Sequence, residues 1–106
     1  MESLIEIKLA EQSDKRRKYT IHHKGSIKFF GLLVVEKYDN WNIELMNVLV
    51  PCKGYGTLLL NYVLNDLFTI NSSILKVTTC PISYESENFF EKNGFDRQTW
   101  TIDKFT

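Results

Sequence analysis

The chain has 106 residues, of which 43% are hydrophobic, and its 13 basic residues balance its 13 acidic residues. This length fits one domain, residues 1–106, with a modest core, and the balanced charge gives no electrostatic reason to expect a nucleic-acid or membrane partner. Cys52 and Cys80 have neither the number nor the spacing of a disulfide framework or a metal site, so we expect no metal. The sequence shows neither a membrane-length apolar run nor a signal-peptide core, which favours a cytoplasmic protein.

The first half of the chain predicts four strands. Residues 3–9 alternate apolar and polar side chains, and residues 18–23 form the expected antiparallel partner across the polar segment 11–16. A more continuous apolar run over 26–38 predicts a central strand, and residues 42–50 predict a fourth.

The second half of the chain alternates helices with strands. Apolar residues recur at three- and four-residue spacing across 57–67, which predicts a helix packed on a sheet. A fifth strand is predicted over 74–79, a short helix over 84–92 and a last strand over 95–102. The order β-β-β-β-α-β-α-β predicts an α+β fold with a mixed central sheet of about six strands and two helices.

The most specific feature is the glycine-spaced turn between the fourth strand and the first helix, which reads Val50-Pro-Cys-Lys-Gly-Tyr-Gly-Thr57. Gly54 and Gly56 allow the backbone to approach a ligand closely, and the next helix presents unpaired N–H groups to the turn. Leu59 stands where the dinucleotide fingerprint needs a third glycine, and the Walker ending is absent. The turn therefore predicts a phosphate site of another kind, with an ordinary strand-turn-helix corner as the alternative.

Two segments resemble motifs of the GNAT superfamily of acetyltransferases. Pro51 to Gly56 is similar to its Arg/Gln-x-x-Gly-x-Gly/Ala element, and Ser83 to Phe95 is similar to its Asn-x-x-Ala-x-x-Phe-Tyr-Glu-Lys-x-Gly-Phe element. The order and separation of the two segments also match, and the resemblance covers roughly residues 26–102. The helices that usually follow the first strand of this family have no counterpart here, so the chain resembles a short form with an open acceptor side.

The resemblance implies acetyl-CoA as the co-substrate. The main chain of the fourth strand would pair with the pantetheine arm and polarise the thioester carbonyl, while the glycine turn would hold the pyrophosphate. Pro51 departs from the family pattern because it can donate no hydrogen bond, and Phe90 replaces a tyrosine that often protonates the departing thiolate. The residues expected to bind the donor are Met46, Val48, Lys53, Gly54, Tyr55, Gly56, Thr57, Ser83 and Phe90.

Acetyl transfer to an amine also needs a base, because an amine with a pKa near ~10.4 is protonated at neutral pH. Glu44 is the first candidate, since regular alternation places it on the same face as Met46 and Val48 in an otherwise apolar strand. The alternative is that Glu44 lies at a solvated margin of the sheet or pairs with a lysine. Further candidates for the base are Glu36, Asp39, His22 and His23.

The candidate proton donor is Tyr84, although it lies about 120° around the predicted helix from Phe90. Departure of the thiolate without an acid, or through water, is the alternative. Cys80 could form an acetyl-enzyme, but a small buried residue is the simpler interpretation because no base is near it in sequence.

Together these residues predict an N-acetyltransferase that moves an acetyl group directly from acetyl-CoA to a primary amine. A protein lysine or N-terminus suits the open acceptor side, and a homodimer is one way to complete it. The second hypothesis is a non-catalytic acyl-CoA-binding or regulatory module of the same fold, because Pro51 and Phe90 remove two expected groups. The third is a structural interaction domain with an empty turn.

Overall fold

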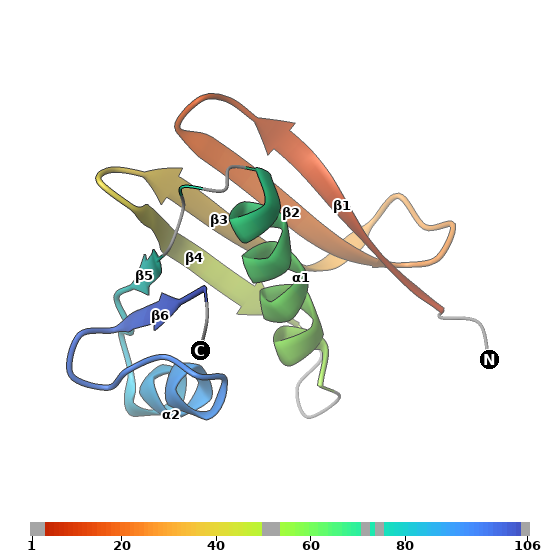
Figure 1. Cartoon of the computed structure of the whole chain (residues 1–106). Coiled ribbons are helices and arrows are strands. Elements are labelled where there is room, and N and C mark those ends of the chain that lie inside the picture. Colours follow the sequence, from red (N-terminus) through yellow and green to blue (C-terminus); the bar gives the residue numbers. More distant parts are fainter. Residues whose placement is uncertain (1–3, 50–53, 71–72, 74–75, 105–106) are drawn as a thin grey trace.

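The computed structural model describes residues 4–49, 54–70, 73 and 76–104, which form a six-stranded sheet and two helices (Figure 1). The elements follow the order β-β-β-β-α-β-α-β, which confirms the predicted order and the α+β class. Their bounds are β1 (Ile5–Gln12), β2 (Arg16–His23), β3 (Phe29–Lys37), β4 (Trp41–Val48), α1 (Tyr55–Ile70), β5 (Lys76–Thr79), α2 (Tyr84–Lys92) and β6 (Thr101–Asp103).

The strands lie side by side in chain order, from β1 to β6. Neighbouring strands are antiparallel except for β4 and β5, which run parallel and are connected by α1. The parallel pair is short, because it begins at Trp41 with Val77 and ends at Ile43 with Thr79. The second half of β4 therefore has no strand beside it on the β5 side, in the part of the chain that the structure describes.

The core lies on one face of the sheet and includes side chains from both helices. The apolar stripe of α1 is buried against this face, which confirms the predicted amphipathic helix. α2 joins the same cluster through Phe90. The N-terminus of α1 and the body of α2 are thus both anchored near the unpaired half of β4. The buried side chains of α1 are Leu59, Leu60, Val63, Leu64 and Leu67.

A polar network connects β2 to the middle of α1. Arg17 is 8% exposed and donates from Nη2 to Asp66 Oδ2 at 2.9 Å and from Nε to the Tyr19 hydroxyl at 2.8 Å. The fully buried Tyr19 donates its own hydroxyl to Asp66. Burial, together with the hydrogen bond to Asp66, raises the pKa of Tyr19 above its usual range. The network fixes how α1 is rotated on the sheet.

The last strand is shorter than predicted, because residues 95–100 form a turn. The Asp96 carboxylate accepts hydrogen bonds from the N–H groups of Gln98 and Thr99, at 2.7 and 3.3 Å. Trp100 has a positive φ of 53° and donates its N–H to the Asp96 carbonyl at 2.7 Å. These local bonds compete with the ladder, so β6 begins at Thr101.

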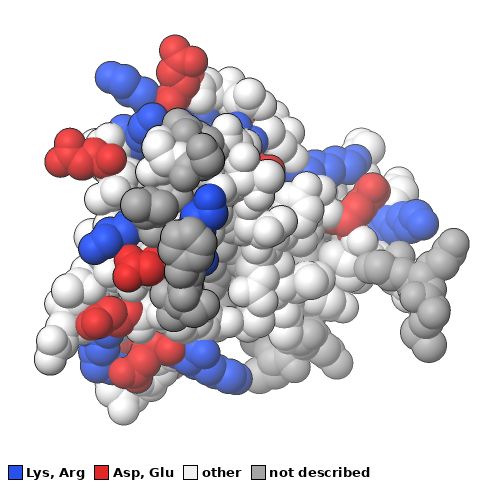
Figure 2. Space-filling view, in the orientation of Figure 1, with Lys and Arg blue, Asp and Glu red and all other residues white. Residues whose placement is uncertain are grey.

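Charged side chains of both signs are intermixed around the margin of the face in Figure 2, and the area over α1 is largely uncharged. α1 itself contains a single charged residue, Asp66. Neither of the described helices combines the length and apolar character that a membrane crossing needs.

Candidate functional site

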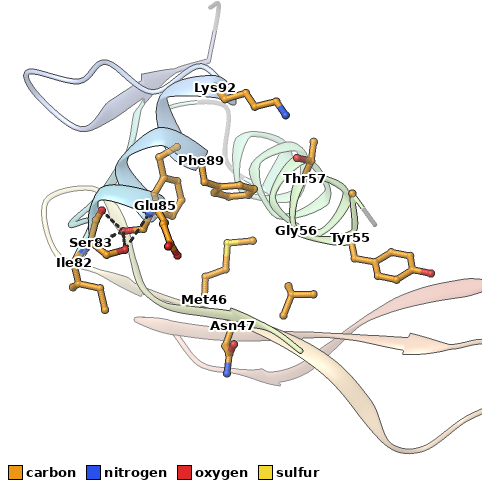
Figure 3. A pocket seen from close by; sticks show the side chains of 14 residues that line it. Met46, Asn47, Tyr55, Gly56, Thr57, Ile82, Ser83, Glu85, Phe89 and Lys92 are labelled. Atoms are coloured by element: carbon orange, nitrogen blue, oxygen red, sulfur yellow. Dashed lines mark hydrogen bonds between the residues drawn. The ribbon is translucent and has the colours of Figure 1, made fainter. Parts of the chain in front are cut away.

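A cavity of about 660 Å³ lies between the second half of β4, the start of α1 and the side of α2 (Figure 3). Its volume is typical of small-molecule sites. The residues predicted to bind the donor meet here, with the exception of Lys53, which lies outside the described residues. Those that line the cavity are Met46, Val48, Gly54, Tyr55, Gly56, Thr57, Ser83 and Phe90.

The start of α1 forms the wall suited to an anion. Gly54 has a φ of +76°, which an L side chain rarely adopts, and its carbonyl accepts the first helical hydrogen bond from Leu58 N–H at 3.0 Å. The N–H groups before that bond have no partner within a helix, and the first turn contains no acidic residue. Backbone donors and the positive end of the helix dipole therefore point toward the cavity.

Gly56 allows α1 and α2 to approach each other. A Cβ at this position would lie 3.3 Å from Phe89 Cε1 and 3.6 Å from Met46 Cε. Figure 3 shows the Phe89 ring and Met46 both directed into the space beside Gly56, whereas Asn47 points away. Gly56 thus lets the Phe89 ring pack closely against the start of α1, and a Cβ there would require the ring to shift by a few tenths of an ångström.

Ser83 fixes the position of α2. Its Oγ accepts from the Ser86 N–H at 3.1 Å, and Ser86 Oγ accepts from the Ser83 N–H at 3.0 Å, which makes a capping box. This confirms the predicted N-cap. It also directs Ser86 and Phe89 into the cavity, two residues that the sequence reading missed although both are on the Phe90 side of the helix.

A smaller cavity of about 100 Å³ adjoins the first where β4 and β5 separate. The two share Met46, Ile82, Ser86 and Phe90 as lining residues. Glu44 of β4 and Cys80, which follows β5, both line the smaller cavity. A group that extends along the larger cavity toward the separation of β4 and β5 would therefore approach Glu44 and Cys80, which are both exposed.

The predicted orientation of Glu44 is wrong, because β4 is not regular there. Val35 pairs with Ile43 and Val34 pairs with Leu45, so Glu44 is the extra residue of a bulge. Met46 and Val48 consequently share the helix-covered face of Ile43, as their partly buried positions show. Glu44 is exposed, and its Oε1 accepts a hydrogen bond from Asn42 Nδ2 at 3.2 Å.

The surroundings of Glu44 are polar. Hydrogen bonds to Glu44 and then Glu36 raise the pKa of Tyr38 to about 12, and the Tyr38 hydroxyl donates to Glu36 Oε2 at 3.2 Å. Glu36 also pairs with Arg16 at 3.5 Å. Glu36 is thus paired with Arg16. Glu44 lines the smaller cavity, and its role as a base stays a prediction.

The other acid-base candidates lie apart from both cavities. Tyr84 is 73% exposed and is not among the described residues that line them, so the geometry gives no support to Tyr84 as the proton donor. His22 is buried and bonded to Thr20 Oγ1 at 2.7 Å, and His23 stacks on Phe30 at 4.7 Å. Asp39 is exposed and, like the histidines, is not found among the described lining residues.

Two charged side chains that the sequence reading missed line the larger cavity, Glu85 and Lys92. Both lie on α2, seven residues apart, which places them on the same side of the helix. The signal that could have found them is their helical spacing from Phe89 in the second motif, because Glu85 lies four residues before it and Lys92 three residues after it.

The architecture is that of an α+β protein whose two central parallel strands separate beside a helix N-terminus. Within that class, an acetyltransferase assigned to the GNAT family from Desulfovibrio desulfuricans matches 77% of this chain and 55% of its own, with a TM-score of 0.64 and 13% identity. The ribosomal-protein-S18-alanine N-acetyltransferase from Escherichia coli matches 80% of this chain and 56% of its own, with a TM-score of 0.65 and 14% identity. N-acetylglutamate synthase from Neisseria gonorrhoeae, complexed with coenzyme A and N-acetyl-glutamate, matches 91% of this chain and 29% of its own, with a TM-score of 0.66 and 16% identity.

These likenesses show that the protein has the GNAT acetyltransferase fold, as its two sequence motifs predicted. The chain spans little more than half the length of the first two structures and less than a third of the last. No protein-family profile and no curated protein matches the sequence.

Proposed function

We propose that the protein is an N-acetyltransferase that moves the acetyl group of acetyl-CoA directly to a primary amine. The observation that carries this proposal is that both sequence motifs line one cavity, from the α1 side and from the α2 side, on a GNAT fold. Residues 13–15 between β1 and β2 form no helix that could wall the acceptor side. An exposed acceptor, such as a protein lysine or N-terminus, suits this openness.

The cavity offers a fitting place for each part of the donor. The start of α1 would take the pyrophosphate. Among the described residues, no atom is recorded within 4 Å of the point where a Cβ of residue 54 would lie, so there is room for a ligand at Gly54. The backbone of β4 after Ile43 has no strand partner on the cavity side among the described residues. An extended chain that carries amides, such as pantetheine, can bind to such an edge as an added strand.

Glu44 is the proposed base, acting on the amine directly or through water. It lines the smaller cavity, where the donor's acetyl end would lie, and Asn42 holds its carboxylate. Glu85 is the second carboxylate that lines the joined cavities. If Glu44 is the base, Glu44→Gln lowers kcat and removes the ascending limb of the pH–rate profile, whereas Glu85→Gln leaves that limb in place.

The transfer needs no covalent enzyme intermediate. Glu44 first takes a proton from the ammonium form of the acceptor, directly or through water. The neutral amine nitrogen then bonds to the acetyl carbon, the C–S bond breaks, and the second proton of the amine passes to water. The thiolate then takes a proton from water, because Phe90 has none to give and Ser86 Oγ already donates to the Ser83 carbonyl at 2.9 Å. Cys80 is exposed, which corrects the expectation of a small buried residue, and it lines the smaller cavity as a free thiol without a role in this route.

A non-catalytic acyl-CoA-binding module is the second candidate, favoured by the buried phenyl ring of Phe90 where a proton donor is expected. Measuring CoA thiol release with small amines, lysine peptides and free N-terminal peptides separates the two. Amine-dependent release that Glu44→Gln diminishes supports the enzyme. Acetyl-CoA binding with no release across the panel supports the binding module, and the absence of binding contradicts both.

A further inference from the structure

The larger cavity carries opposite charges at its two ends. Glu85 and Lys92 are the charged residues among those that line it, and the helical rise separates them by about 10 Å along α2. Figure 3 shows Glu85 directed toward Met46 near Ser83, and Lys92 extending from the other end of α2 toward the α1 side of the cavity. The cavity is thus acidic toward the separation of β4 and β5 and basic toward the start of α1.

Lys92 has no carboxylate partner in the part of the chain that the structure describes. The residue one turn before it on α2 is Asn88, so the helix provides no acidic neighbour at that spacing. The nearby carboxylates Glu87 and Glu91 are both taken by Arg97, at 3.1 Å each. The ammonium of Lys92 is therefore an uncompensated positive charge at the cavity.

We propose that Lys92 binds a phosphate of coenzyme A and makes the site select a phosphorylated donor over a phosphate-free pantetheine thioester. This inference rests on the proposed function. The start of α1 supplies backbone donors without full charge, and Pro51 in the preceding turn has no hydrogen to donate. A lysine across the cavity adds the missing charge, and an ammonium is a suitable point-charge partner for phosphate.

The same polarity fixes the direction in which the substrates lie. The phosphates of the donor are drawn to the Lys92 end, while a protonated amine is drawn toward Glu85 and Glu44 at the other end. The two substrates therefore enter from ends whose charges attract them.

The experiment compares Lys92→Gln and Lys92→Arg with the wild-type protein by calorimetry. Lys37→Gln is the matched control, because it removes an exposed lysine at the far end of β3 from this cavity. The ligands are acetyl-CoA, acetyl-dephospho-CoA and S-acetylpantetheine. Comparison of the first two shows whether Lys92 binds the 3′-phosphate or the diphosphate.

Lys92 is exposed, and the loss of its charge-assisted contact is expected to weaken acetyl-CoA binding about five- to thirtyfold. Lys92→Arg and Lys37→Gln should bind acetyl-CoA like the wild type. S-acetylpantetheine should bind to Lys92→Gln and to the wild type equally. The difference in acetyl-CoA affinity between the wild type and Lys92→Gln should become smaller as the salt concentration rises. If Lys92 instead serves α2 as a cation at its C-terminal end, Lys92→Gln lowers the melting temperature without changing donor preference, which overturns the proposal. Equal loss for all ligands overturns it as well. Wild-type protein that binds no acetyl-CoA contradicts the proposed function itself.

Discussion

Asp66→Asn should destabilise the protein far more than an ordinary surface charge change. Asp66 Oδ2 accepts hydrogen bonds from Arg17 and Tyr19, and the side chains of Arg17 and Asp66 are 10% and 32% exposed. Leaving a buried charge without its partner costs about 3–5 kcal/mol. Water at the exposed part of Asp66 reduces this, so we expect a loss of about 2–3 kcal/mol, or roughly a 10 °C drop in melting temperature.

Denaturant unfolding of Asp66→Asn and Glu11→Gln measures this difference. Glu11 is the matched control because it pairs with Lys18 at 3.9 Å on the surface, and such a pair contributes less than about 1 kcal/mol. The triple variant Arg17→Met/Tyr19→Phe/Asp66→Leu should recover stability relative to Asp66→Asn, since it removes the buried charge together with both of its polar partners. Equal midpoints for Asp66→Asn and Glu11→Gln would refute the reasoning.

Two further predictions concern the sheet. Because the pKa of Tyr19 is raised in the folded protein, its contribution is present below the unfolded pKa of about 10 and declines above it, by about 1.4 kcal/mol per pH unit. Unfolding free energies from pH 9 to 11 should fall less steeply for Tyr19→Phe than for wild type, and parallel curves would contradict this. Gly31→Ala should cost about 1–3 kcal/mol, because its Cβ would lie 2.8 Å from Ile21 Cγ2 and 3.2 Å from the Asn47 carbonyl oxygen. An unchanged denaturation midpoint would count against this packing.

The sequence predicted those parts of the fold that depend on local signals. Apolar alternation located the strands, and the Ser83 cap with Gly94 at a φ of +103° set both ends of α2. Two walls of the cavity were also predictable. One is the start of α1, which follows the glycine turn, and the other is α2, which follows the Ser83 cap, and both signals are present in the sequence. The last strand was overestimated because the Asp96 side chain bonds to its own backbone neighbours.

The features that the sequence did not predict depend on contacts between distant segments. The bulge at Glu44 arises from the register between β3 and β4, so strict alternation gave the wrong face. Arg17 and Asp66 meet across 49 positions, and neither residue alone indicates a buried pair. Lys92 belongs to the second motif, but the sequence does not show that it lines the same cavity as the start of α1. That follows from the packing of both helices on the same face of the sheet.

The central claim is that the start of α1 binds the phosphates of acetyl-CoA, and Thr57→Glu tests it most directly. Thr57 lines the cavity in the first turn, where a glutamate favours the helix dipole but repels a bound phosphate. Calorimetry with acetyl-CoA should show at least about tenfold weaker binding to Thr57→Glu than to the neutral control Thr57→Gln, with an equal or higher melting temperature for the glutamate variant. Equal affinity of the two variants for acetyl-CoA would contradict the claim.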